Sequence, residues 1–112
     1  MEYKLFLDDI RSVQMIYPEA KDTDFVIVRS YDAFVKTIQE TGLPAFISFD
    51  NDLGCNADGT LLPEGYDAAK WLVYESELDL SALKFYVHSS NPVAKSNIES
   101  LLNNYIRFLK KE

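Results

Sequence analysis

The sequence predicts an α/β fold in which helices flank one parallel sheet of four strands. Four short runs are apolar on both alternating faces, which is typical of strands covered on both sides. The segments between them carry apolar residues at the spacing of a helix. With 112 residues, of which 47% are hydrophobic, the chain fits one domain, residues 1–112, with a substantial core.

The expected elements follow from these patterns in order. Strands are predicted at residues 4–7, 25–28, 46–49 and 85–87. A helix is expected after Ser30 and is stopped by Gly42, and a second carries an apolar stripe at residues 68–73. The clearest helix begins with an Asn91 cap and proline at its first position, and it ends near Lys110 and Lys111.

The segment from residue 10 to residue 24 has a weak period and contains Pro18. Its length suffices for a parallel crossover, as either a short helix or a loop. Right-handed crossovers then give the strand order 2-1-3-4, with the switch point between the first and third strands. Ligand sites in such folds lie at that switch point.

Carboxylates follow both strands at the switch point. Asp8 and Asp9 end the first strand, and Asp50 and Asp52 follow the third. Four acids so close repel one another, and a divalent cation relieves the repulsion. Oxygen ligands suit Mg²⁺ or Mn²⁺. The alternative is that these residues only cap turns.

Polar groups also follow the fourth strand. Ser89, Ser90 and Asn91 precede the last helix, whose N-terminus favours an anion such as phosphate. Because proline lacks an N–H, the backbone donors would be those of Val93 and Ala94.

Three further residues near this edge carry candidate chemistry. His88, the only histidine, suits a general acid or base, although a structural role is about equally expected. Arg11 and Arg29 could pair with phosphate oxygens or with the carboxylates.

The stretch 54–65 is long and rich in turn residues, as lids and binding loops often are. A hairpin centred on Asp58 and Gly59 is the simpler interpretation. Cys55 has no second cysteine to pair with.

Composition and charge limit the classes of partner that the protein is expected to bind. A net charge of −7 and a pI near 4.6 argue against an extended nucleic-acid surface. The sequence shows neither a secretory leader nor an apolar run long enough to span a membrane. We therefore expect a cytoplasmic protein.

The acidic pair, the later Asp50 and the hydroxyl of Ser89 resemble the response-regulator receiver domain. In that family the corresponding acids hold Mg²⁺, and the aspartate at the position of Asp50 accepts a phosphoryl group. The chain ends in the helix after the fourth strand, so the family's fifth strand and its lysine are absent from the pattern.

A closer resemblance is to the cyclic-phosphate processing receiver domains. Its motifs read here as LFLDDIR (5–11), VRSYDAF (28–34), SFDNDLG (48–54), GYDAAKWL (65–72) and HSSNPVAKSNIESLL (88–102). The resemblance implies a receiver-like, flavodoxin-like three-layer sandwich with a truncated sheet and no fifth strand. Two departures are Asn51, where the family often has histidine, and Ala94-Lys95, where it often has Gly-Arg.

The resulting hypothesis is a metal-dependent phosphoesterase that processes a cyclic phosphate on a small molecule, a nucleotide or an RNA end. Its predicted residues are Asp50, His88 and Ser89 for catalysis, Arg11, Arg29, Ser90 and Asn91 for the substrate, and Asp8, Asp9, Asp50 and Asp52 for Mg²⁺ or Mn²⁺. Asp50 is either a metal ligand or a nucleophile. The alternative is a degenerate receiver that binds a protein partner without turnover.

Overall fold

The computed structural model describes residues 2–55 and 57–111. Its sheet contains β1 (Lys4–Leu7), β2 (Val26–Val28), β3 (Phe46–Phe49) and β4 (Lys84–Val87). All neighbouring strands are parallel, in the order β2-β1-β3-β4. The predicted receiver-like α/β architecture and strand order are confirmed, and the described residues contain no fifth strand of this sheet.

The strand sequences are apolar on both faces because both faces are covered. Leu5, Leu7, Ile47 and Phe49 project to one face, and all four are fully buried or nearly so. Phe6, between two of them, projects to the other face and is equally buried. Alternation of side chains along a strand therefore supplies two apolar surfaces from one short run.

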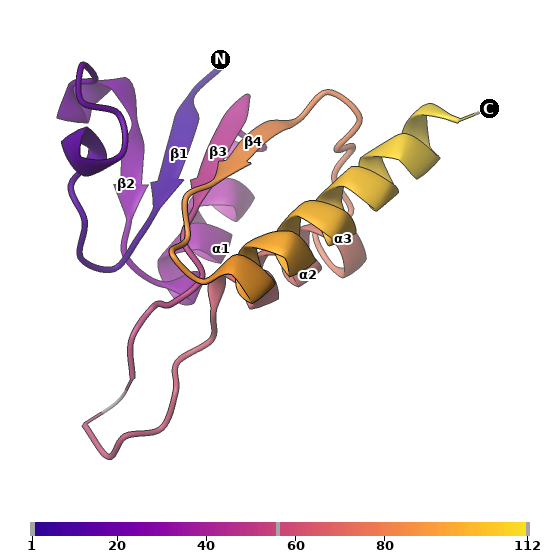
Figure 1. The fold of residues 1–112 in the computed structure, drawn as a ribbon. Helices are drawn as coiled ribbons and strands as arrows, with labels where there is room; N and C mark the ends of the chain where they lie inside the picture. Colours follow the sequence, from indigo (N-terminus) through magenta and orange to yellow (C-terminus); the bar gives the residue numbers. More distant parts are fainter. Residues whose placement is uncertain (1, 56, 112) are drawn as a thin grey trace.

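Three helices cover the face that carries Leu5 and Leu7. They are α1 (Tyr31–Thr41), α2 (Gly65–Tyr74) and α3 (Pro92–Lys110), which lie together on one side of the sheet (Figure 1). Their buried stripes are Phe34 and Ile38, Ala68 and Leu72, and Ile98 and Leu102. Burying each large apolar side chain contributes about 1.5–3 kcal/mol, so this cluster stabilises the fold strongly.

The helix ends match the capping signals. Ser30 Oγ accepts a hydrogen bond from Ala33 N at 3.1 Å, and Asn91 Oδ1 accepts from two amides at the start of α3. Gly42 ends α1 with φ +97°, a conformation that favours glycine. Both predicted caps are confirmed.

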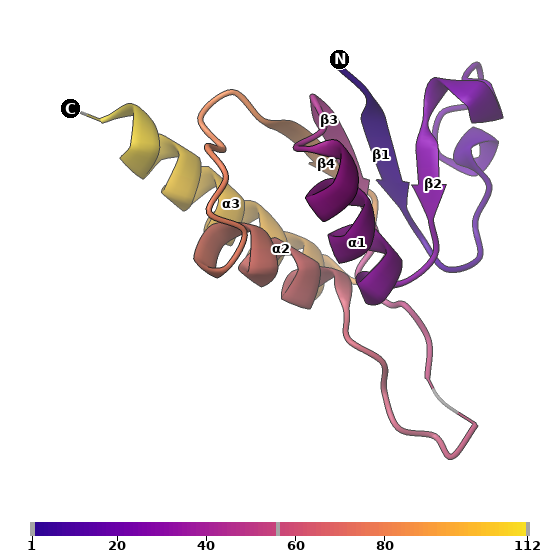
Figure 2. The ribbon, with the colours of Figure 1, turned by 180° about the vertical axis from the view of Figure 1, so that it is seen from behind.

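The second face of the sheet is covered by the crossover from β1 to β2. This segment is a loop with two 3₁₀ turns, η1 (Val13–Met15) and η2 (Asp22–Asp24), on the side of β2 away from the helices (Figure 2). Tyr17 and Phe25 stack at 5.4 Å between ring centroids, and both rings contact Phe46. The layer on this face is therefore a loop with an aromatic underside.

The long loop after β3 extends away from the body of the domain (Figure 1). Cys55 and Leu61 form an isolated antiparallel bridge, and Leu62 N donates to Gly54 O at 3.1 Å. Gly59, at the tip, has φ +87°. The predicted hairpin is thus present in the described residues.

None of the helices in residues 2–55 and 57–111 combines the length and the apolarity that crossing a bilayer requires.

Gly65 fixes the distance between β3 and α2. A Cβ placed there would lie 2.0 Å from Asp50 O, and Gly65 N donates to Asn51 O at 2.8 Å. Only a residue without a side chain lets the first turn of α2 approach the end of β3 so closely.

We expect Gly65→Ala to destabilise the protein by about 1–3 kcal/mol, because the added methyl meets backbone atoms. In an unobstructed helix the same change would stabilise by about 0.5–1 kcal/mol. Chemical denaturation provides the measurement, with the exposed helical change Lys36→Ala as the control. A Gly65→Ala protein as stable as the wild type would contradict this packing.

Candidate functional site

Three buried side chains converge where β1, β3 and β4 end. Asp8, Asp50 and His88 each follow the last residue of a strand, and one ligand atom from each lies within 4.8 Å of the others. The sheet ladder continues by one bond into each residue: Asp8 N to Val28 O, Asp50 N to Leu7 O, and His88 N to Phe49 O. Parallel register therefore fixes the backbone of all three residues.

Arg11 is the cation that faces both carboxylates. Its Nη1 lies 3.0 Å from Asp8 Oδ2 and 3.4 Å from Asp50 Oδ1. A tight turn holds it there, because Asp8 Oδ1 accepts from Ile10 N and Arg11 N at 3.0 and 2.9 Å. Arg29 supports the turn from outside, since its Nη1 donates to Asp8 O and Arg11 O.

The two carboxylates have opposite pKa shifts. Burial alone would raise the pKa of Asp8, but hydrogen bonds from two amides, His88 and Arg11 outweigh it and hold the pKa below its usual value. Burial, with the nearby charge of Asp8, raises the pKa of Asp50 to about 6. Asp50 is therefore the carboxylate that gains most from an added cation.

His88 belongs to a hydrogen-bonded chain that crosses the sheet. Its Nε2 lies 3.0 Å from Asp8 Oδ2, and its Nδ1 lies 2.7 Å from Ser48 Oγ, which is 2.8 Å from Tyr17 OH. The imidazole also stacks on Phe6 with ring centroids 4.9 Å apart. Ser48 and Tyr17 were not among the predicted site residues.

Donors and acceptors in this chain follow from the protonation states. Burial lowers the pKa of His88, although Asp8 opposes the shift, so the neutral ring is favoured. Ionised Asp8 can only accept, so Nε2 carries the proton and Nδ1 accepts from Ser48, which accepts from Tyr17. The hydroxyls of Ser48 and Tyr17 can each either donate or accept, so both hydrogen bonds can reverse their direction. His88 Nδ1 would then donate to Ser48, and Nε2 would be free to bind a metal.

The other two predicted metal ligands, Asp9 and Asp52, are more exposed than Asp8 and Asp50. Asp9 is half-buried, and burial followed by the charges of Asp8 and Asp52 raises its pKa. Asp52 is exposed, and its Oδ1 accepts from Gly54 N at 3.0 Å. That bond is the turn-capping contact considered as the alternative role, and a metal-binding role for Asp9 or Asp52 stays a prediction.

The residues predicted to bind phosphate form a turn at the start of α3. Ser89 Oγ accepts from Asn91 N at 3.1 Å, and Ser90 is exposed. The amides of Val93 and Ala94 both donate to Asn91 Oδ1 at 3.1 Å. The expectation that these two amides are free for phosphate is therefore wrong, because the capping side chain uses them.

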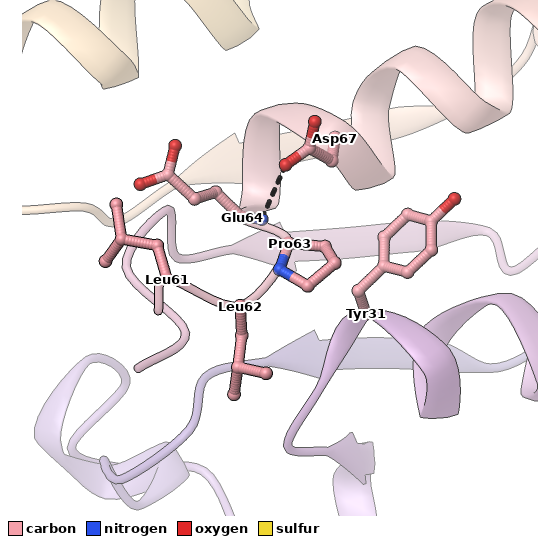
Figure 3. Close-up of a pocket in the computed structure, with 6 residues that line it drawn as sticks. All are labelled: Tyr31, Leu61, Leu62, Pro63, Glu64 and Asp67. Atoms are coloured by element: carbon pink, nitrogen blue, oxygen red, sulfur yellow. Dashed lines mark hydrogen bonds between the residues drawn. The ribbon is translucent and has the colours of Figure 1, made fainter. Parts of the chain in front are cut away.

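A separate pocket of about 470 Å³ lies between the long loop, α1 and the start of α2 (Figure 3). Its lining is apolar around Tyr31 and Leu62 and acidic at Glu64 and Asp67, where Glu64 N donates to Asp67 Oδ2. The two carboxylates make this pocket unsuited to phosphate. It contains none of the three converging residues. The candidate site is therefore the edge of the sheet where Asp8, Asp50 and His88 meet, which we call the acidic edge.

A sheet ordered β2-β1-β3-β4, with carboxylates ending β1 and β3, defines a receiver-like domain. The chain belongs to the cyclic-phosphate processing receiver domain family, whose model matches residues 3–104. Comparisons with curated proteins and with solved structures found no match. The family resemblance expected from the motifs is thus confirmed.

Ser48→Ala is expected to lower the free energy of unfolding by about 1–3 kcal/mol, because it leaves His88 Nδ1 buried without a partner. Tyr17→Phe, which keeps the ring and removes only the last hydroxyl, should cost less, about 0.5–1.5 kcal/mol. Denaturation curves measure both. Equal stability of Ser48→Ala and the wild type would show that the hydrogen bonds linking His88, Ser48 and Tyr17 contribute nothing to the stability of the fold.

Asp50→Asn should stabilise the metal-free protein at about pH 7.5, by about 1–3 kcal/mol. Because the pKa of Asp50 is raised, the wild type loses stability as pH rises from the ordinary value of 3.8 through about 6. The advantage of the variant should therefore be absent below about pH 4 and constant well above pH 6. Denaturation in a chelator at several pH values tests this, with exposed Asp79→Asn as the matched control. An advantage that shrinks as pH rises would contradict the assignment.

Proposed function

We propose that this domain uses a divalent cation, Mg²⁺ or Mn²⁺, to open a cyclic phosphate to a phosphate monoester. Water would add to phosphorus, one ring P–O bond would break, and the released ring oxygen would take up a proton. The substrate would be a small molecule, a nucleotide or an RNA end carrying the cyclic phosphate. The family match to residues 3–104 supports the reaction class.

The observation that carries the proposal is the buried cluster of Asp8, Asp50 and His88. Two carboxylates and an imidazole fit a divalent metal, and a bound cation would supply charge neutralisation and polarise a phosphate oxygen. Carboxylates alone suit Mg²⁺, whereas direct ligation by imidazole would favour Mn²⁺. The reversible direction of the Ser48 and Tyr17 hydroxyls accommodates either arrangement.

Arg11 is the residue best placed to contact the phosphate. It is half-buried, and its guanidinium lies against Asp8 and Asp50. A guanidinium has five N–H groups, so contact with these carboxylates through Nη1 leaves other donors for phosphate oxygens. We assign Arg11 to neutralising charge on the transferring phosphate. Arg29, which contacts backbone carbonyls, is assigned to holding the Asp8–Arg11 turn, with phosphate contact left as its alternative role.

Asp50 and His88 take different roles in this proposal. The Asp50 carboxylate either binds the cation or removes a proton from the attacking water, and its pKa of about 6 in the metal-free protein suits the second role. When the carboxylates alone hold the metal, we assign His88 to orienting Asp8, because both its ring nitrogens are engaged and its side chain is only 1% exposed. Ser89, Ser90 and Asn91 remain the proposed contacts at the start of α3.

The proposed binding of a divalent cation is tested by thermal unfolding in the presence of Mg²⁺ or Mn²⁺. Wild-type protein should gain stability with metal concentration, because the cation offsets repulsion between Asp8 and Asp50. Asp50→Asn should lose most of this gain, while Asp79→Asn should keep it. A wild type that neither metal stabilises would overturn the metal assignment.

The reaction is tested with 2′,3′-cyclic nucleotides and RNA ending in a cyclic phosphate, followed by chromatography of the products. We expect metal-dependent formation of monoesters, lowered about 100-fold or more by Asp50→Asn or Arg11→Ala. Metal binding without product from any of these substrates would favour a non-catalytic receiver. A trapped aspartyl phosphate on Asp50 would identify Asp50 as the nucleophile and replace the water mechanism.

A further inference from the structure

The second face of the sheet carries an unusual row of side chains. Lys4, Phe46 and Lys84 are the first residues of β1, β3 and β4, and they stand in register across the sheet. Residues paired in this way project to the same face. Neighbouring strands lie about 4.8 Å apart, so the two lysine stems are about 10 Å apart with Phe46 between them.

A pocket of about 390 Å³ lies above this row. Its wall is completed by Tyr17 and Phe25 from the crossover, with Ala20, Asp24 and Ala45 at its edge. The rings of Tyr17, Phe25 and Phe46 are mutual neighbours, with centroids 5.4 to 6.4 Å apart. Both the volume and the aromatic lining are typical of pockets that hold small molecules.

The charge of this pocket is opposite to that of the chain as a whole. The protein has a net charge of −7, yet the lining brings together Lys4 and Lys84. Across residues 2–55 and 57–111, no carboxylate lies within ion-pair distance of either ammonium. Lys4 Nζ instead lies 5.4 Å from the Phe25 ring centroid, and the Asp24 carboxylate accepts from Lys21 N.

We propose that this pocket binds a planar aromatic ring bearing an anionic group, of which a nucleoside monophosphate is an example. The ring packs against the apolar wall that Tyr17, Phe25 and Phe46 form. The anionic group lies toward Lys4 and Lys84, which have positive charge to offer. This site is at the opposite ends of the strands from Asp8, Asp50 and His88, so the proposal stands independently of the proposed reaction.

The test is a titration of isotope-labelled, chelator-treated protein with adenosine 5′-monophosphate, followed by two-dimensional NMR of the amides. We expect the shifts to centre on residues 4, 25, 46 and 84. Lys84→Glu should weaken binding about tenfold or more, since it reverses one of the two positive charges that line the pocket. Lys36→Glu, an exposed substitution on α1, should bind like the wild type.

Adenosine and inorganic phosphate serve as partial probes. Each should bind at least about tenfold more weakly than the monophosphate, because each lacks one of the two recognised groups. Shifts confined to the edge around Asp8 and Asp50, adenosine binding as tightly as the monophosphate, or equal binding by Lys84→Glu would overturn the proposal. None of these outcomes depends on metal or on turnover, so failure here leaves the proposed function untouched.

Discussion

Two carboxylates held side by side in the protein interior need a compensating positive charge, and much of this domain is arranged around that need. Asp8 and Asp50 are both buried, and the guanidinium of Arg11 lies against both. The compensation is uneven, because Asp8 has two amides, Arg11 and His88 as donors. Asp50 is left with a pKa near 6. This imbalance is the physical basis for expecting a divalent cation.

Register in the parallel sheet creates the pair. Leu7, Phe49 and Val87 are paired across β1, β3 and β4, so the next residue of each strand reaches the same edge. Gly65 then allows α2 to pack close to Asp50, and the turn after Asp8 returns Arg11 to the carboxylates. A shift of register by one residue would turn one of the two acids to the opposite face of the sheet and separate the pair.

Much of the fold could be predicted from the sequence, because strand runs, helix periods and caps are local signals. Ser30, Asn91 and the four apolar runs determined most element boundaries. The structure of the crossover was harder to predict, since residues 10–24 are held by aromatic packing with Phe46 rather than by a local period. Where local signals are weak, contacts distant in sequence determine the conformation.

The candidate site was predictable only in part. Strand-end position identified Asp8, Asp50 and His88, but it could not show that His88 points at Asp8. Ser48 was missed although it carried a signal: a hydroxyl in the middle of a buried strand needs a buried partner. Tyr17 had no such signal, because its partner lies 31 positions away. Val93 and Ala94 were misjudged because one capping side chain can satisfy two amides.

The most direct test of the account is paramagnetic line broadening by substoichiometric Mn²⁺ in NMR spectra of the wild-type protein. Signals from Asp8, Asp50, His88 and their neighbours should broaden first, and excess Mg²⁺ should restore them by competition. The same titration of Asp50→Asn should leave these signals sharp. Broadening centred elsewhere, or none at this edge, would contradict the central claim that the buried carboxylate pair binds a divalent cation.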